Sequence, residues 1–219
     1  RSTLDRSSAA SDVYKRQYKD MNKNGKPVAV VIGATSKWQS DGRNTHLVHG
    51  ADIEDSDLPV GIRWGVGGAI SQRFAQEGFF TVLTTRNAVN AEPLDESIKE
   101  MGGKSIIVEL DLSSPDSICS SFAKIRQLVG DPEVLIYNAG YLEGRELPLE
   151  KELLEHIPFK IFETAQQLNS SGPFLVTKEV LPAMRKRGKG SILFSNNPSS
   201  LRGRKRYTGQ SLYLSLIHI

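Results

Sequence analysis

Cysteine is almost absent from the sequence, since Cys119 is the only one in 219 residues. A disulfide framework and a metal site built from several cysteines are therefore excluded. Long apolar runs are also missing, because no stretch approaches the roughly 20 residues that a membrane-spanning helix needs. We therefore expect a protein without a membrane partner, whose single thiol suits a reducing compartment, the cytoplasm.

An excess of one sign of charge is missing too. The chain has 28 lysine and arginine residues against 25 acidic ones, a formal net charge of +3. Two basic clusters, at 185–189 and 202–206, lack the interleaved aromatic residues and the motifs of nucleic-acid-binding domains. We interpret them as a solvated helix end or a phosphate-facing loop and expect no nucleic-acid partner. The hydrophobic content of 38% suffices for one buried core, hence one globular domain.

Both ends of the chain contain a hexapeptide that resembles translated sequencing adaptor. One transposon-end DNA sequence, read in its two directions, can encode both residues 12–17 (DVYKRQ) and residues 214–219 (LSLIHI). We therefore predict that residues 1–17 are a non-native leader and that 214–219 are a non-native tail. The native domain then covers 18–213.

Short apolar runs alternate with amphipathic stretches along this domain. Apolar runs of about five residues predict strands that are buried on both faces, as in a parallel sheet. The alternation of such strands with helices predicts an α/β fold with a doubly wound parallel sheet, which is Rossmann-like. The expected strands are 27–32, 79–84, 105–110, 133–137 and 191–194, and the expected helices are 69–77, 91–102, 116–129 and 159–186.

Glycines follow the first expected strand. Gly33 comes directly after it, and Gly65, Val66 and Gly67 open the next amphipathic stretch. A buried strand, a glycine turn and a helix N-terminus together offer bare backbone N–H groups and a positive dipole end to a pyrophosphate. This pattern predicts a nucleotide cofactor, although glycines taken alone can also be ordinary turns.

An insert at 36–64 separates the two parts of this glycine loop. A loop of that length in a compact domain is either functional, for example as a cap on the pyrophosphate, or an unspliced segment. It carries His46 and His49 before a run of acidic residues. Histidines and carboxylates at such loose spacing are usually solvated, so we expect no metal site.

The glycine loop resembles one motif of the short-chain dehydrogenase/reductase family. Gly33, Gly65 and Gly67 match its Thr-Gly-x-x-x-Gly-x-Gly loop, with Ile32 in place of the threonine and with the insert between the first two glycines. The resemblance covers most of 27–194. It implies the family's nicotinamide cofactor and fold, with later strands beyond residue 213, so the sheet is expected to be incomplete at its C-terminal edge.

Two further motifs follow in the same order. Asn138, Ala139 and Gly140 match the family's Asn-Ala-Gly motif, which lines the adenosine side of the cofactor cleft. Asp111 and Leu112 match the acidic-apolar pair that meets the adenine ring in the family. The resemblance therefore implies that all five residues bind the cofactor.

The choice between NADP and NAD depends on the residues after the second strand. An acidic residue there would bond the ribose 2′-hydroxyl, whereas a cationic residue would meet a 2′-phosphate. The segment 84–87 reads Thr-Thr-Arg-Asn, with no carboxylate and with Arg86 in place. A bidentate guanidinium contact to phosphate favours NADP over NAD, and the alternative is a solvated surface arginine.

The long helical stretch carries a polar residue that the resemblance connects with catalysis. Asn169, followed by Gly172 and Phe174, resembles the family's Asn-x-x-Gly-x-Phe segment. In the family, this asparagine bends the helix and holds a water in the proton relay. The alternative is an ordinary polar residue within a helix.

The family's serine has no direct counterpart after the fifth strand. In the family, this hydroxyl orients the substrate oxygen. Counted from Gly190, the position falls on Asn197. The role has therefore either moved to Ser195 or been lost.

The family's Tyr-x-x-x-Lys motif cannot be read in this chain. In the family, the tyrosine donates the proton and the lysine lowers the tyrosine pKa. Our candidates for the tyrosine are Tyr207 and Tyr213, but Ser211 and Ile217 stand four residues after them. Both tyrosines can equally be structural.

The resemblance as a whole implies an oxidoreductase. We expect the complete protein to transfer a hydride between NADP(H) and a small carbonyl or alcohol substrate, as a homo-oligomer, and we expect this chain alone to be inactive. The alternative is a non-catalytic nucleotide-binding module with the same fold.

Overall fold

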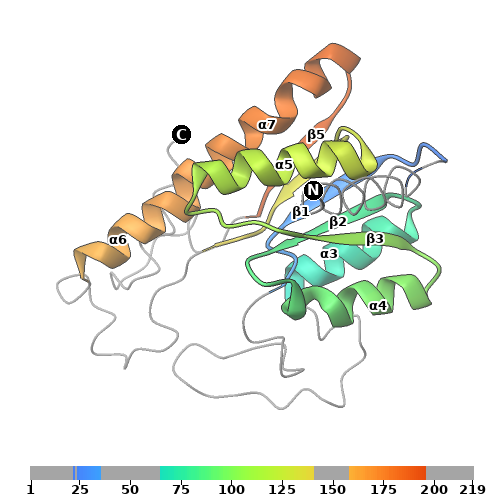
Figure 1. The fold of residues 1–219 in the computed structure, drawn as a ribbon, viewed down its shortest axis with the longest axis horizontal. Coiled ribbons are helices and arrows are strands. Elements are labelled where there is room, and N and C mark those ends of the chain that lie inside the picture. The colour runs from blue at the N-terminus through green and yellow to red at the C-terminus, as the bar shows by residue number, and fades with distance from the viewer. Residues whose placement is uncertain (1–21, 23, 36–64, 141–157, 196–219) are drawn as a thin grey trace, which may run out of the picture.

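The computed structural model describes residues 22, 24–35, 65–140 and 158–195 (Figure 1). Its centre is a five-stranded sheet in which all paired strands are parallel, in the order β3-β2-β1-β4-β5. Each predicted strand is confirmed to within one residue at either end. The strands are β1 (Val28–Ile32), β2 (Phe80–Thr85), β3 (Lys104–Glu109), β4 (Val134–Tyr137) and β5 (Ser191–Phe194).

Helices occupy the stretches between these strands. The first of them begins at Gly65, earlier than the predicted 69, because tertiary packing overrides the low helix propensity of its glycines. The long helical stretch predicted over 159–186 is confirmed, and the structure adds a π-helical turn within it. The helical elements are α3 (Gly65–Gln76), η2 (Ala88–Ala91), α4 (Glu92–Glu100), α5 (Pro115–Val129), α6 (Phe159–Gln166), the π turn η5 (Gln167–Ser171) and α7 (Gly172–Arg187).

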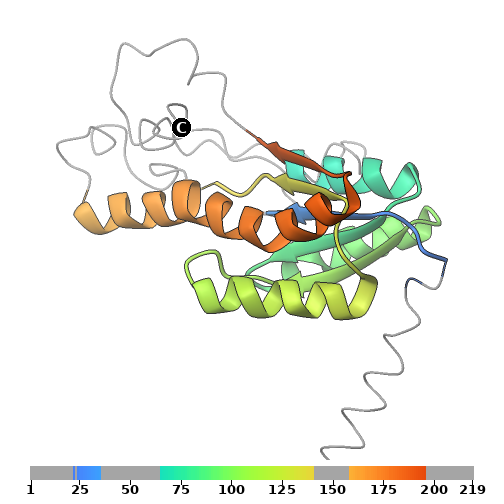
Figure 2. The same cartoon turned by 90° about the horizontal axis from the view of Figure 1, so that it is seen from above.

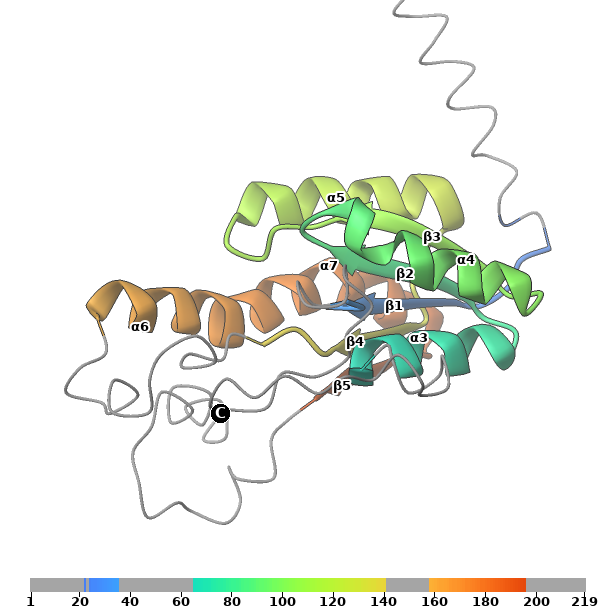
Figure 3. The same cartoon turned by 90° about the horizontal axis from the view of Figure 1, so that it is seen from below.

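Helices cover both faces of the sheet. Strand side chains alternate between the faces, so Val30 packs in the cluster of Phe122 and Val180 from α5 and α7. Its neighbour Val31 packs in a second cluster, with Leu94 of α4. In Figure 1, α5 and α7 lie above the sheet and α3 and α4 below it, and Figures 2 and 3 show the two layers from above and from below. The fold is a doubly wound α/β sheet, as the sequence predicts.

The strand order places a crevice in the middle of the sheet. From β1 the chain proceeds outward to β2 and β3, and then returns to β4 on the other side of β1. In open parallel sheets, ligands bind outside the carboxyl ends of the strands at such a switch point. The candidate site is therefore expected where β1 and β4 end.

Within the part of the chain that the structure describes, no helix combines the length and the apolar character needed to cross a membrane.

Candidate functional site

The loops that follow β1, β2 and β4 begin side by side at one edge of the sheet. Backbone hydrogen bonds continue past the ends of β1 and β4, since Ala34 N donates to Thr84 O at 3.1 Å and Asn138 N donates to Ile32 O at 2.8 Å. The predicted motif residues after these strands are therefore brought together, although they are far apart in the sequence.

The glycine loop packs backbone against backbone. Gly33 has a φ of 76°, and a Cβ atom on it would lie 2.7 Å from the backbone N of Ala139. A Cβ atom on Gly67 would lie 2.2 Å from the carbonyl oxygen of Gly33. The Asn138 side chain also holds the loop in place, because its Nδ2 donates to the Gly33 carbonyl oxygen at 3.1 Å. Only glycine therefore fits at both loop positions.

The N-terminus of α3 has the properties of an anion site. Gly65 starts the helix with a φ of 63°, and no acidic residue lies in the first turn. The first N–H groups of a helix lack intrahelical partners and carry the positive end of its dipole. Val66 in this turn is 64% exposed. These features fit the pyrophosphate of a dinucleotide.

Thr35 lies in the loop after β1, close to the candidate site. Its Oγ1 is buried and has no hydrogen-bond partner within the described residues. Buried hydroxyl groups are normally paired. Thr81 in β2 and Thr177 in α7 also have buried hydroxyl groups without a partner among the described residues, so this feature by itself does not identify a ligand.

Arg86 lies at the end of β2, exposed, and its charge reaches the loop after β3. There the carboxylate of Asp111 accepts from Ser113 N at 2.9 Å and from Ser113 Oγ at 2.7 Å. These hydrogen bonds are the main cause that lowers the pKa of Asp111, and the positive charge of Arg86 lowers it further. The side chain of Asn87, next to Arg86, instead caps η2 by accepting from Val89 N. Arg86 is therefore a cation at this part of the candidate site.

The remaining residues predicted to bind the cofactor lie at the same edge. Leu112 is only 7% exposed and packs in the core, so what it presents to a ligand is backbone rather than side chain. Ala139 is partly buried against Gly33, and Gly140 is exposed beside it. These positions agree with a binding role, which stays a prediction.

Asn169 lies in the π turn η5 and is 1% exposed. The turn is tied to the sheet by Tyr137, the last residue of β4, whose hydroxyl donates to the Leu168 carbonyl oxygen. Ser195 follows β5, and its N donates to Tyr137 O at 2.8 Å. Of the predicted catalytic residues, Ser195 is thus bonded to Tyr137 directly, and Asn169 follows the residue whose carbonyl Tyr137 binds. Sequence reasoning missed Tyr137, although a buried tyrosine hydroxyl generally needs a partner.

The other predicted catalytic residues, Tyr207 and Tyr213, lie outside the described residues. The same holds for the insert 36–64 with His46 and His49, and for the predicted leader and tail. Their roles stay predictions. Among the residues that the structure does describe, no group of three or more histidine, cysteine or acidic side chains could hold a metal ion.

Comparison with known sequences identifies a family. Residues 58–215 match the family described as short chain dehydrogenase. The 3-oxoacyl-[acyl-carrier-protein] reductase FabG of Aquifex aeolicus (strain VF5) is 32% identical over 157 residues, which are 71% of this chain and 59% of that protein. The NADP-dependent 3-hydroxy acid dehydrogenase YdfG of Shigella flexneri is 31% identical over 156 residues, 71% of this chain and 58% of that protein. The chain thus spans less than two thirds of the length of these relatives.

Comparison with solved structures supports the fold. A crystal structure of a variant of actinorhodin polyketide ketoreductase with NADPH is similar with a TM-score of 0.68 at 22% sequence identity. The similarity covers 90% of this chain and 62% of the ketoreductase chain. At that identity the likeness concerns the doubly wound sheet and its helices.

Proposed function

The chain belongs to the short chain dehydrogenase family, and from that premise we propose that the complete protein transfers a hydride between NADP(H) and a small carbonyl or alcohol substrate. The observation that carries the proposal is the close backbone packing of Gly67 on Gly33 at the start of α3. This packing leaves a helix N-terminus, without acidic residues in its first turn, beside the switch point of the sheet.

NADP is the proposed cofactor rather than NAD. Arg86 is exposed at the end of β2, and no carboxylate occurs in the segment 84–87 that would bond a ribose 2′-hydroxyl. A guanidinium group can bind a 2′-phosphate through two parallel hydrogen bonds. The Shigella relative is named as NADP-dependent, and the ketoreductase structure contains NADPH, which supports the same choice.

The chain's own residues would then orient the substrate and transfer a proton to it. NADP(H), when bound, supplies the hydride. We propose that Ser195 orients the substrate oxygen, that Tyr207 or Tyr213 donates the proton to it, and that Asn169 holds the polar relay behind the tyrosine. The burial of Asn169 in a π turn supports this role, since such turns are frequent at functional sites.

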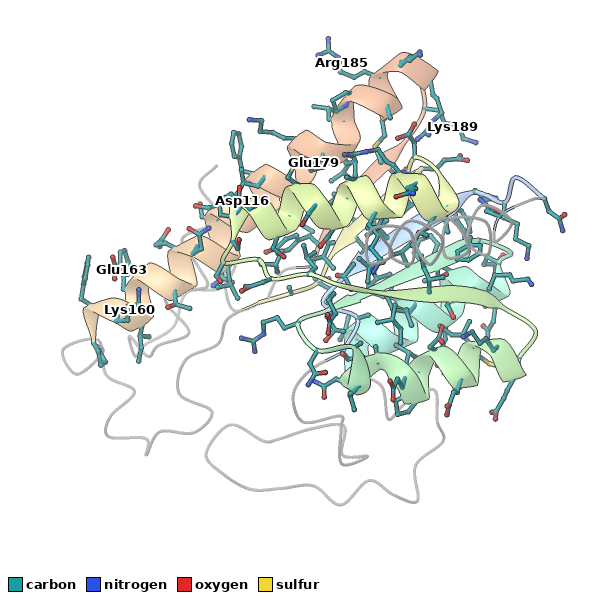
Figure 4. The ribbon with its side chains drawn as sticks, viewed as in Figure 1. Asp116, Lys160, Glu163, Glu179, Arg185 and Lys189 are labelled. Carbon is teal, nitrogen blue, oxygen red and sulfur yellow. The ribbon has the colours of Figure 1, made fainter. Side chains whose placement is uncertain are left out.

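A cofactor titration tests the binding half of the proposal. We expect Arg86→Ala to weaken NADPH binding at least about tenfold and to leave NADH binding within about twofold, because only NADPH carries the 2′-phosphate. Intrinsic or nucleotide fluorescence measures both affinities. Arg185→Ala is the matched control, because Arg185 is an exposed arginine in the last turn of α7. In Figure 4 it lies far from Asp116, which marks the start of α5 just after the loop that contains Asp111. Equal loss for both nucleotides would contradict the assignment to NADP.

A second candidate function is a nucleotide-binding module without catalysis. It is favoured by one observation, that Ser211 and Ile217 stand where a lysine would follow Tyr207 and Tyr213. Sequencing the complete reading frame and assaying NADPH oxidation with small ketones separate the two. The module without catalysis would be established if the complete reading frame has no basic residue four positions after either tyrosine and the protein binds NADPH but does not oxidise it.

The remaining expectations concern the complete protein. We propose that it is a cytoplasmic homo-oligomer, and exposed aromatic side chains on α6 and α7 offer apolar surface for such an assembly: Phe159, Phe162 and Phe174. Sedimentation of the complete protein at several concentrations measures its state of association.

A further inference from the structure

The π turn η5 leaves one carbonyl group without a helical donor. In an α-helix the Leu168 carbonyl would accept from the N–H of Gly172, but this N–H donates to Gln167 O instead. In the π register the donor would be residue 173, which is Pro173 and has no N–H. The Leu168 carbonyl therefore needs a donor from outside the helix.

Tyr137 provides that donor. Its side chain is 3% exposed and its hydroxyl donates to Leu168 O. The hydroxyl fits because residue 172 is glycine, since a Cβ atom there would lie 2.5 Å from the Tyr137 oxygen. The ring is held further by a tilted contact with Phe194 of β5, with centroids 6.3 Å apart. The strand end, the glycine and the π turn thus form one fitted contact.

The contact lies next to Asn169 on the sheet-facing side of the helix. Asn169, Gly172, Val176 and Val180 are all buried and recur at intervals of three or four residues, so they share one face. A return of the turn to α-helical hydrogen bonding would rotate Asn169 relative to this face. In Figure 1, α6 and α7 run on as one rod, so the local turn rather than a bend of the whole element sets the position of Asn169.

We propose that Tyr137 is a positioning residue for Asn169. By satisfying the Leu168 carbonyl, the Tyr137 hydroxyl holds the π turn and so holds the Asn169 side chain in the orientation that the relay uses. The role of Asn169 in this statement rests on the proposed function, whereas the effect of Tyr137 on the turn does not.

A structural measurement tests the turn without any turnover. In Tyr137→Phe, we expect the amide exchange of residues 169–172 to speed up by about tenfold or more and the Asn169 side-chain NMR signals to shift. Val180→Ala is the matched control, because it removes buried volume from the same helix face and leaves the hydroxyl in place. Unchanged exchange and signals in Tyr137→Phe, or equal changes in Val180→Ala, would overturn the proposal.

A rescue variant tests the chemistry of the contact. Pro173→Ala restores an N–H in the π register of the Leu168 carbonyl, so adding Tyr137→Phe to this background should change exchange by less than about twofold. A full effect of Tyr137→Phe in the Pro173→Ala background would contradict the argument from the missing donor.

Kinetics of the complete enzyme test the link to Asn169. We expect Tyr137→Phe to lower kcat by about tenfold, to leave KM for NADPH within about twofold, and to have no further effect in an Asn169→Ala background. Additive losses would show that Tyr137 does not act through Asn169. If the complete protein binds NADPH but has no turnover, the proposed function fails, and the exchange measurement still decides the role of Tyr137 in the turn.

Discussion

At the scale of single residues, Gly67 has almost no room for a side chain. A Cβ atom there would lie 2.2 Å from Gly33 O and 2.8 Å from the Asn138 amide nitrogen, and both neighbours belong to the site. We expect Gly67→Ala to lower the free energy of unfolding by about 1–3 kcal/mol through overpacking, and to weaken cofactor binding with it. Urea unfolding and nucleotide titration measure the two effects. The control is Val66→Ala, one residue away and exposed, which should stay within about 0.5 kcal/mol of the parent.

Asp111 offers a test of local electrostatics. Because hydrogen bonds from Ser113 are the main cause of its lowered pKa, Ser113→Ala should raise that pKa toward the ordinary value of about 3.9. A carboxylate with a lowered pKa stabilises the folded state above its unfolded pKa, and this stability is lost as the pH falls through the folded pKa. NMR titration of the carboxyl carbon follows the change. Arg86→Ala should raise the pKa less, and the reverse order of the two effects would refute this account.

At the scale of elements, α5 begins with a hydrogen-bonded N-cap. Ser114 is its N-cap and accepts from Ser117 N at 3.2 Å, and Pro115 occupies the first turn. We expect Ser114→Ala to destabilise the fold by about 1 kcal/mol, because it leaves a helix N–H unpaired. Ser120→Ala, on an exposed position of the same helix, is the control. Equal unfolding free energies for the two variants would show that the cap contributes nothing measurable.

The elements also show where local pattern suffices. The five strands could be predicted from local sequence because each of them is a short apolar run. The strands β1 and β2 are buried along their whole length, as strands of a parallel sheet covered on both faces are, whereas β5 is largely exposed. The π turn does not follow from pattern, since 159–186 has the periodicity of one helix and the turn depends on Tyr137 from another element. Gly172 and Pro173 are the local sequence features associated with the π turn, but their meaning becomes clear only once the contact with Tyr137 is known.

At the scale of the whole molecule, β5 forms an exposed apolar edge of the described sheet. Among the described strands β5 pairs with β4 alone, and its Leu193 and Phe194 are 49% and 53% exposed. Exposed apolar edge strands promote association between chains. We therefore expect Leu193→Lys to raise the highest concentration at which this chain is still monomeric, as measured by light scattering. Val89→Lys makes the same kind of change at an exposed residue away from the edge, and an equal gain there would rule out the edge as the cause.

The sequence by itself determined the alternation of strands and helices, the family, and the motif residues at the strand ends such as Gly33, Arg86 and Asn138. It could do so because apolar periodicity is local and because parallel strands bring all their carboxyl ends to one edge. Only the tertiary structure decided the strand order, the packing of Gly67 on Gly33, and the bond from Tyr137 to the Leu168 carbonyl. These features depend on atoms that are distant in the chain and meet only when the sheet is assembled, so no local pattern encodes them.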